Sequence, residues 1–133
     1  MAFYLGSKSE EKLIGVHPDL VRVVRRAITI SQVDFTVLEG LRTDERQKRL
    51  FEEETATSTL NSRHLKGKFW GHAVDLGAYV NGRVSYDWKY YFIIEKAMKL
   101  AAKLENVPIE WGGDWETKKD GPHWQLPWSK YPK

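Results

Sequence analysis

The stretch Ala73-Val-Asp-Leu-Gly-Ala-Tyr-Val-Asn-Gly-Arg-Val-Ser85 decides the fold of this 133-residue chain. Its first eight residues predict a strand over 73–80, and Asn81-Gly82 is a strong signal for a two-residue hairpin turn. Residues 83–85 then begin the returning strand. Asp75 interrupts the apolar run, so its carboxylate must be exposed, paired or bound to a metal.

Apolar residues at helical spacing predict a helix on either side of this hairpin. The first covers residues 16–30, with Pro18 in its first turn, where a proline is well tolerated. The second covers residues 88–104, and Asp87 is suited to cap it.

The remaining segments complete a mixed pattern of helices and strands. Thr43 is suited to cap a further helix that runs to about residue 54, and the Thr- and Ser-rich residues 55–62 predict a surface loop. Shorter strands are expected at residues 34–39, 109–111 and 123–126. This alternation indicates an α+β fold: a small, mostly antiparallel sheet with helices packed on one side, in a single domain over residues 1–133. The pattern leaves the order of the strands open.

Composition and charge limit the classes of function. The chain has no cysteine, which excludes disulfides and thiolate metal sites, and its net charge of +3 favours approach to nucleic acid or to a bacterial envelope. The Lys and Arg residues are dispersed and no nucleic-acid motif is present, so we expect no nucleic-acid partner. No apolar run approaches a membrane span and the N-terminus does not resemble a signal peptide. We expect a monomer without stable membrane insertion.

Two histidines and two carboxylates are the residues that indicate a chemistry. Zinc in catalytic sites usually takes three nitrogen or oxygen ligands and keeps a fourth position for water, and His64, Asp75 and His123 can supply those ligands. Asp120 would then be the base that takes a proton from the attacking water. The alternatives are a hydrogen-bonded loop histidine at His64 and a solvated turn residue at Asp120.

His72 competes with His64 as a ligand. His72 and Asp75 are three residues apart on a predicted strand, so their side chains point to opposite faces and cannot reach one metal without a bulge. Asp120 and His123 have the same spacing, but Gly121-Pro122 between them favours a turn that can bring both to one point.

The motifs around these residues resemble those of the zinc D-alanyl-D-alanine carboxypeptidase family, with its S-x-H-x-x-G-x-A-x-D and [DE]-x-x-H patterns. Within that family the chain is most similar to phage endolysins that cut between L-alanine and D-glutamate in peptidoglycan, which share a Trp-Gly-Gly-Asp-Trp segment. The matching residues are Ser62-x-His64, Gly71-x-Ala73-x-Asp75, Asp120-x-x-His123, the G-x-R signature Gly40-Leu-Arg42, and Trp111 to Trp115.

The resemblance implies a zinc-dependent endopeptidase that hydrolyses the L-alanyl-D-glutamate bond of peptidoglycan stem peptides for host lysis. It places Zn²⁺ on His64, Asp75 and His123. It makes Asp120 the catalytic base and gives Arg42 the role of binding the oxyanion or the substrate carbonyl. Ser62 and Trp70 would contact substrate. The enzyme would stay in the host cytoplasm before release and then act in the periplasm and cell wall. The alternatives are a D,D-carboxypeptidase that releases terminal D-alanine and a non-catalytic relative that binds cell wall.

One segment departs from the family pattern. His64 and Asp75 are eleven residues apart, four more than in the family motif, and the extra residues lie between His64 and Gly71. They can bulge out as a loop that leaves His64 on the metal, with Phe69 and Trp70 near substrate, or they can displace His64 and spoil the zinc site. We expect the first outcome.

The tryptophans and Asp114 have two interpretations each. The tryptophans can line a groove for stem peptides or sugars, or close the core of a small sheet. Asp114 can support a ligand or cap a turn. The tryptophans concerned are Trp111, Trp115, Trp124 and Trp128.

Overall fold

A computed structural model describes residues 2–43, 46, 48–49, 62–67 and 69–132, and the structural statements below concern these residues. Helices and short strands alternate along the chain, as predicted. The elements are α1 (Ser7–Lys12), α2 (Pro18–Ile30), β1 (Phe35–Glu39), β2 (Ala73–Val80), β3 (Arg83–Ser85), α4 (Trp88–Glu105), β4 (Glu110–Trp111), the 3₁₀ turn η1 (Gly112–Asp114) and β5 (His123–Gln125).

Strand β2 is the centre of an antiparallel sheet with the order β1-β2-β5-β4. One edge of β2 pairs with β1, and the opposite edge pairs with β5 near its start and with β3 near its end. The predicted hairpin between β2 and β3 is confirmed: Val80 pairs with Arg83, and Asn81 and Gly82 have the positive φ angles (53° and 78°) that this tight turn requires.

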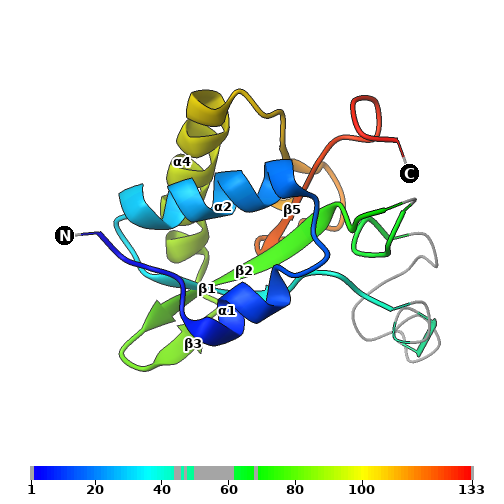
Figure 1. The fold of residues 1–133 in the computed structure, drawn as a ribbon. Helices are drawn as coiled ribbons and strands as arrows, with labels where there is room; N and C mark the ends of the chain where they lie inside the picture. Colours follow the sequence, from blue (N-terminus) through cyan, green and yellow to red (C-terminus); the bar gives the residue numbers. More distant parts are fainter. Residues whose placement is uncertain (1, 44–45, 47, 50–61, 68, 133) are drawn as a thin grey trace.

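The two long helices pack on one face of this sheet (Figure 1). Alternate residues of β2, namely Val74, Leu76 and Ala78, are fully buried in the core that the helices close. Because strand side chains alternate between faces, Asp75 points to the opposite side, away from the helices. The predicted α+β class is therefore confirmed, and the same strand supplies both the floor of the core and a carboxylate outside it.

The ends of the long helices agree with the sequence signals. Pro18 begins α2, and the backbone N–H of Asp19 donates to Nδ1 of His17, which the sequence reasoning had not identified as the cap. Asp87 caps α4 as predicted, with its carboxylate accepting from the N–H of Lys89 at 3.1 Å. These side chains satisfy backbone donors that a helix start leaves without partners.

Helix α1 was not predicted, and it covers the outer edge of β1. The N–H of Val37 donates to the hydroxyl of Ser9 at 3.0 Å, and the same hydroxyl bonds that of Thr36 at 2.9 Å. An unpaired sheet edge invites aggregation, and a covering helix removes that risk. Gly40 permits the close approach, because a Cβ there would collide with the carbonyl of Lys12.

Most of the helix expected from Thr43 to residue 54, and the loop expected after it, lie outside the described residues. At its start the N–H of Arg46 donates to the hydroxyl of Thr43 at 3.1 Å, which is the bond expected of a capping threonine. Among the helices that the structure describes, none is long and apolar enough to cross a membrane.

Candidate metal centre

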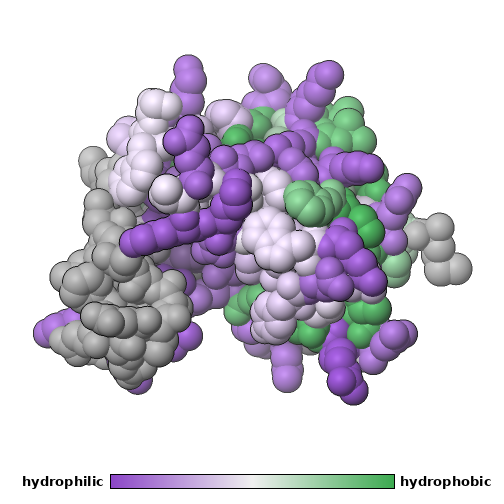
Figure 2. Space-filling view, turned by 180° about the vertical axis from the view of Figure 1, so that it is seen from behind, coloured by the Kyte–Doolittle hydropathy of each residue, from purple (hydrophilic) through white to green (hydrophobic). Residues whose placement is uncertain are grey.

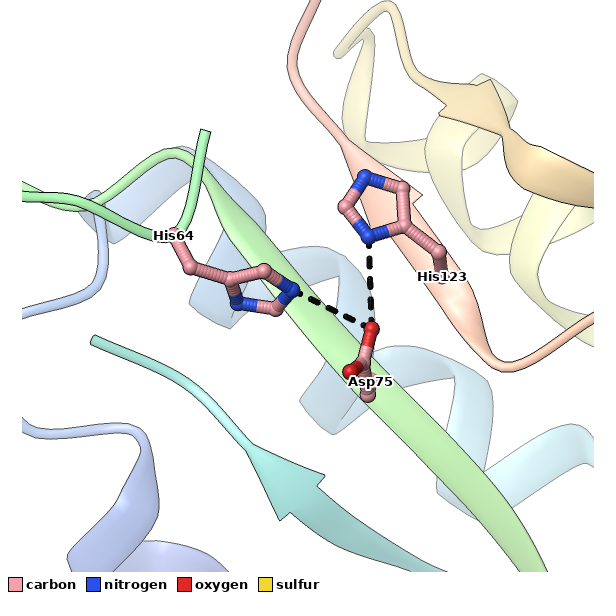
Figure 3. A group of neighbouring side chains, drawn as sticks. All are labelled: His64, Asp75 and His123. Carbon is pink, nitrogen blue, oxygen red and sulfur yellow. Dashed lines mark hydrogen bonds and ion pairs between the residues drawn. The ribbon is translucent and has the colours of Figure 1, made fainter. Parts of the chain in front are cut away.

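Three side chains from separate parts of the chain meet on the outer face of the sheet (Figure 3). Asp75 comes from β2 and His123 from β5, where the two residues are paired in register. Oδ1 of Asp75 lies 3.2 Å from Nε2 of His64 and 3.3 Å from Nδ1 of His123. The potential ligand atoms of all three residues lie within 4.8 Å of one another, which is compact enough for one ion.

Hydrogen bonds behind the two histidines select which ring nitrogen faces the centre. Nδ1 of His64 lies 2.8 Å from the carbonyl oxygen of Gly40, which can only accept, so this nitrogen carries the proton. Nε2 of His123 lies 2.8 Å from Oε1 of Gln125, and the amide of Gln125 is oriented by its donation to Glu110 at 3.4 Å. With its proton on the outer nitrogen, an imidazole at either position would turn the lone pair of its inner nitrogen toward Asp75 and toward an ion bound there.

This arrangement fits a divalent metal. Without a cation, a proton on His64 or His123 can bond the carboxylate of Asp75; with a cation, the two imidazole lone pairs and the carboxylate oxygen can all turn toward it. Burial favours the neutral form of Asp75, but bonds to His123 and His64 outweigh it and hold the pKa of Asp75 well below its usual range. A ligand set of two nitrogens and one carboxylate oxygen is typical of catalytic zinc.

The inserted residues do not keep His64 from the centre. Beyond His64 the N–H of Gly67 donates to the carbonyl of Trp70 at 2.8 Å. The backbone of His64 is fixed on both sides: its N–H donates to the hydroxyl of Ser62 at 3.1 Å, and its carbonyl accepts from the N–H of Arg42 at 2.7 Å. The hydroxyl of Ser62 thus helps to orient His64.

His72 lies apart from this group. It is buried beside His17, with ring centroids 5.8 Å apart, and burial followed by the charges of Arg63 and His17 lowers its pKa to about 4. Trp70 is partly exposed next to the same ring of His17, at 6.2 Å, and Phe69 is exposed. The alternation along the start of β2 thus places His72 and Asp75 in different surroundings, as strand geometry requires.

Asp120 sits at the border of the metal centre on a tight turn. The N–H of His123 donates to its carbonyl at 3.2 Å, and its own N–H donates to the carbonyl of Gly112 at 3.0 Å. Burial raises the pKa of Asp120 and so does the charge of Asp75, while the cationic forms of His123 and His64 and the charge of Arg42 act against them. A carboxylate with a raised pKa beside a metal centre is suited to general base catalysis.

Arg42 is buried rather than on the surface, with 5% of its area exposed. Its guanidinium makes a bidentate pair with Glu39, in which Nε and Nη2 donate at 2.9 and 2.8 Å, and Arg46 reaches the same carboxylate at 3.2 Å. Burial alone would raise the pKa of Glu39, but the bonds from Arg42 outweigh it and lower that pKa. The fork of Arg42 is therefore held in one orientation.

The structure supports the core interpretation for two of the four tryptophans. Trp111 and Trp124 are core residues, stacked with centroids 5.6 Å apart, whereas Trp115 tilts against the ring of His123 at 5.2 Å and forms a wall of the metal centre. The guanidinium of Arg63 lies 4.1 Å from the ring of Trp128. Asp114 is exposed and pairs with Lys99 at 2.8 Å, so it does not support a ligand.

A small antiparallel sheet that brings together two histidines and an aspartate able to hold a metal, with a second carboxylate beside them, fits the class of metal-dependent hydrolases. Comparison with known proteins gives the particular family. The chain belongs to the phage L-alanyl-D-glutamate peptidase family, whose model matches residues 1–125. It is therefore an enzyme of the peptidase class.

Individual relatives agree with this assignment. The L-alanyl-D-glutamate peptidase of Escherichia phage T5 is 31% identical over 121 residues, covering 90% of this chain and 87% of that protein. The peptidase of the same name from Listeria phage A118 is 31% identical over 99 residues, covering 74% of this chain but only 32% of the longer relative. The crystal structure of the L-Ala D-Glu endopeptidase ChiX of Serratia marcescens matches with a TM-score of 0.88 and 49% identity, over 96% of this chain and 92% of that one.

Sequence reasoning missed the residues that hold the ligands and Arg42 in place. Gln125 is two residues after His123 on a strand, so strand periodicity alone would have placed both on one face. Glu39 is three residues before Arg42, a spacing that the sequence shows but gives no reason to prefer. The carbonyl of Gly40 is a backbone group, and no side-chain pattern could have indicated it.

Proposed function

We propose that this protein is a zinc-dependent endopeptidase that hydrolyses the L-alanyl-D-glutamate bond of peptidoglycan stem peptides, and that a phage uses it to lyse its host. The observation that carries the proposal is the convergence of His64 Nε2, His123 Nδ1 and Asp75 Oδ1 in a member of this peptidase family. Zinc bound there would polarise the scissile carbonyl and lower the pKa of water to about 7.

The residues around the centre have complementary roles. Asp120 accepts the proton of the attacking water and returns it to the nitrogen of the leaving D-glutamate as the amide bond breaks. Its raised pKa supports this role, because a base of very low pKa would hold the proton too weakly to transfer it.

Arg42 would bind the substrate carbonyl and stabilise the negative charge that develops on its oxygen. Its buried position and its bidentate pair with Glu39 support this role, because a donor fixed before reaction loses little free energy in reorganising. Trp70, which is exposed beside His17, would contact the stem peptide. The bond from His64 to the Ser62 hydroxyl favours orientation of the ligand over direct substrate contact for Ser62.

The proposal extends to where and how the protein acts. We place it in the host cytoplasm before release and then in the periplasm and cell wall, as a monomer with one zinc peptidase domain over residues 1–133. The similarity to phage peptidases over most of the chain supports the lytic role.

Metal analysis and product analysis test the proposal together. The purified protein should contain one zinc per chain, and EDTA should abolish its release of peptides from peptidoglycan until zinc is restored. Mass spectrometry of the digest should show new N-terminal glutamate. Release of free alanine would instead indicate a D,D-carboxypeptidase, and cell-wall binding without zinc or cleavage would indicate a non-catalytic relative.

A further inference from the structure

Three exposed aromatic side chains form a strip at the start of α4. Tyr86, Trp88 and Phe92 are 66%, 38% and 51% exposed. The rings of Trp88 and Phe92 are 5.8 Å apart and rest on the buried ring of Trp111, at 6.2 and 6.0 Å. The exposed rings are thus held in place by the core beneath them. In the view from behind, Figure 2 shows pale and green side chains gathered among hydrophilic ones.

The aromatic strip is continuous with the catalytic region. Trp88 contacts the buried ring of Tyr91 edge-on at 5.3 Å, and Tyr91 packs so closely on Gly121 that any Cβ there would collide with its ring. Gly121 directly follows Asp120 in the chain. Burial raises the pKa of Tyr91, and the charges of Tyr86, Asp120 and Asp75 raise it further, so Tyr91 adjoins both the strip and the centre.

Beside the strip lies an open pocket of about 590 Å³ between the β2–β3 hairpin and the start of α4. Tyr86 and Tyr90 supply aromatic walls, and Asn81, Arg83 and Ser85 supply polar groups. Aromatic faces with a few hydrogen-bonding side chains match a pyranose ring, which presents apolar C–H faces and peripheral hydroxyl and acetamido groups.

We propose that the aromatic strip and this pocket bind the glycan strand of peptidoglycan. The inference rests on the proposed function: L-alanine is joined by its amine to the lactyl group of a sugar, so the proposed scissile bond lies one residue from the glycan. A stem peptide seated at Asp120 therefore carries its sugar to the border of the centre. The strip reaches that border through Trp88 and Tyr91, where a saccharide can stack on exposed rings.

Two substrates test the proposal: a glycan-linked muropeptide and the same stem peptide without sugar. Trp88→Ala and Phe92→Ala should each lower the ratio of kcat/KM for the glycan-linked substrate to that for the free peptide by roughly tenfold, as expected for an interfacial aromatic. Leu104→Ala is the matched control, since Leu104 is 53% exposed on the same helix and outside the strip. A ratio unchanged in both strip variants would overturn the proposal.

A binding measurement separates this inference from the proposed function. The tetramer of N-acetylglucosamine should shift the NMR signals of the strip and pocket in wild-type protein, and Phe92→Ala should weaken its affinity by about tenfold. Sugar binding without peptide cleavage would refute the proposed function alone, whereas cleavage of free peptide without sugar binding would refute the glycan surface alone. Loss of self-association in Phe92→Ala with no change in sugar affinity would assign the strip to a second copy and overturn the proposal. If Trp88→Ala does not fold, Tyr86→Ser takes its place.

Discussion

Replacing Gln125 by leucine should weaken zinc binding by about 10- to 100-fold, although Gln125 does not face the ion itself. Its Oε1 accepts the Nε2 proton of His123 at 2.8 Å in a buried environment. Without metal, the leucine variant can avoid an unpaired donor, because His123 can move its proton to Nδ1 and donate to Asp75. A metal on Nδ1 removes that option and leaves a buried N–H facing leucine.

The magnitude follows from that unpaired donor. A buried donor without a partner costs about 1–3 kcal/mol, and each 1.4 kcal/mol is a factor of about ten in the dissociation constant. The metal-free protein avoids this cost, so the substitution should lower the affinity for zinc without lowering the stability of the metal-free fold. Gln125→Glu, made together with Glu110→Gln so that two carboxylates do not face each other, keeps the acceptor and should bind zinc at least as tightly as the wild type. Glu110→Gln should have little effect, since its bond to Gln125 is long at 3.4 Å and Glu110 is exposed.

Competition with a chromophoric chelator measures the dissociation constants, and thermal unfolding of the metal-free proteins checks the fold. A folded Gln125→Leu variant with wild-type zinc affinity would refute the reasoning. Equal weakening in the glutamate variant would also refute it, since packing alone would then explain the effect.

Three further predictions concern the base, the buried histidine and the turn. Asp120→Asn should retain zinc by metal analysis and lose about 10²- to 10⁴-fold in kcat, so loss of the metal would contradict its assignment as base. Burial lowers the pKa of His72 to about 4 in the fold, below its ordinary value of about 6.5 in an unfolded chain. The unfolded state therefore takes up protons first, and the free energy of unfolding should fall by roughly 3 kcal/mol as the pH drops between those values. Urea unfolding should show a smaller loss in His72→Gln, and an equal loss would exclude His72 as the cause. Gly112→Ala should destabilise the protein by about 1–3 kcal/mol and reduce kcat. The reason is that the new Cβ would lie 2.9 Å from the Cβ of Asp120 and 3.1 Å from the Cβ of His123. Normal activity in a peptide-release assay would contradict this prediction and show that the turn can shift.

Local features of the fold were readable from the sequence, whereas features set by distant contacts were not. The Asn81-Gly82 hairpin and the Asp87 cap depend on a few neighbouring residues, and both were predicted. Helix α1 has six residues and is secured by the bond between Ser9 and Val37, so no local periodicity reveals it. The strand order was likewise left open because β2 pairs with β5 across almost fifty residues, and nothing in either segment specifies that partner.

The candidate site shows the same division. The motif around His64 indicated a ligand, but whether the four extra residues leave it at the centre depended on contacts with distant residues, such as the bonds of His64 to Gly40 and Arg42. The sequence matches Arg42 to the G-x-R signature, but only the fold shows that this side chain is buried against Glu39. Residue types thus indicated the chemistry. The groups that orient these residues could be identified only from the tertiary structure.

The three candidate ligands also matter for mechanical integrity. The ligands come from the segment before β2, from β2 and from β5. An ion held by all three would therefore cross-link the middle of the chain to its C-terminal part. The chain has no cysteine and hence no disulfide to do this. An ion at a concentration of a hundred times its dissociation constant would add about 2.7 kcal/mol to the free energy of unfolding. A chelator should therefore lower the stability of the fold as well as stop the reaction.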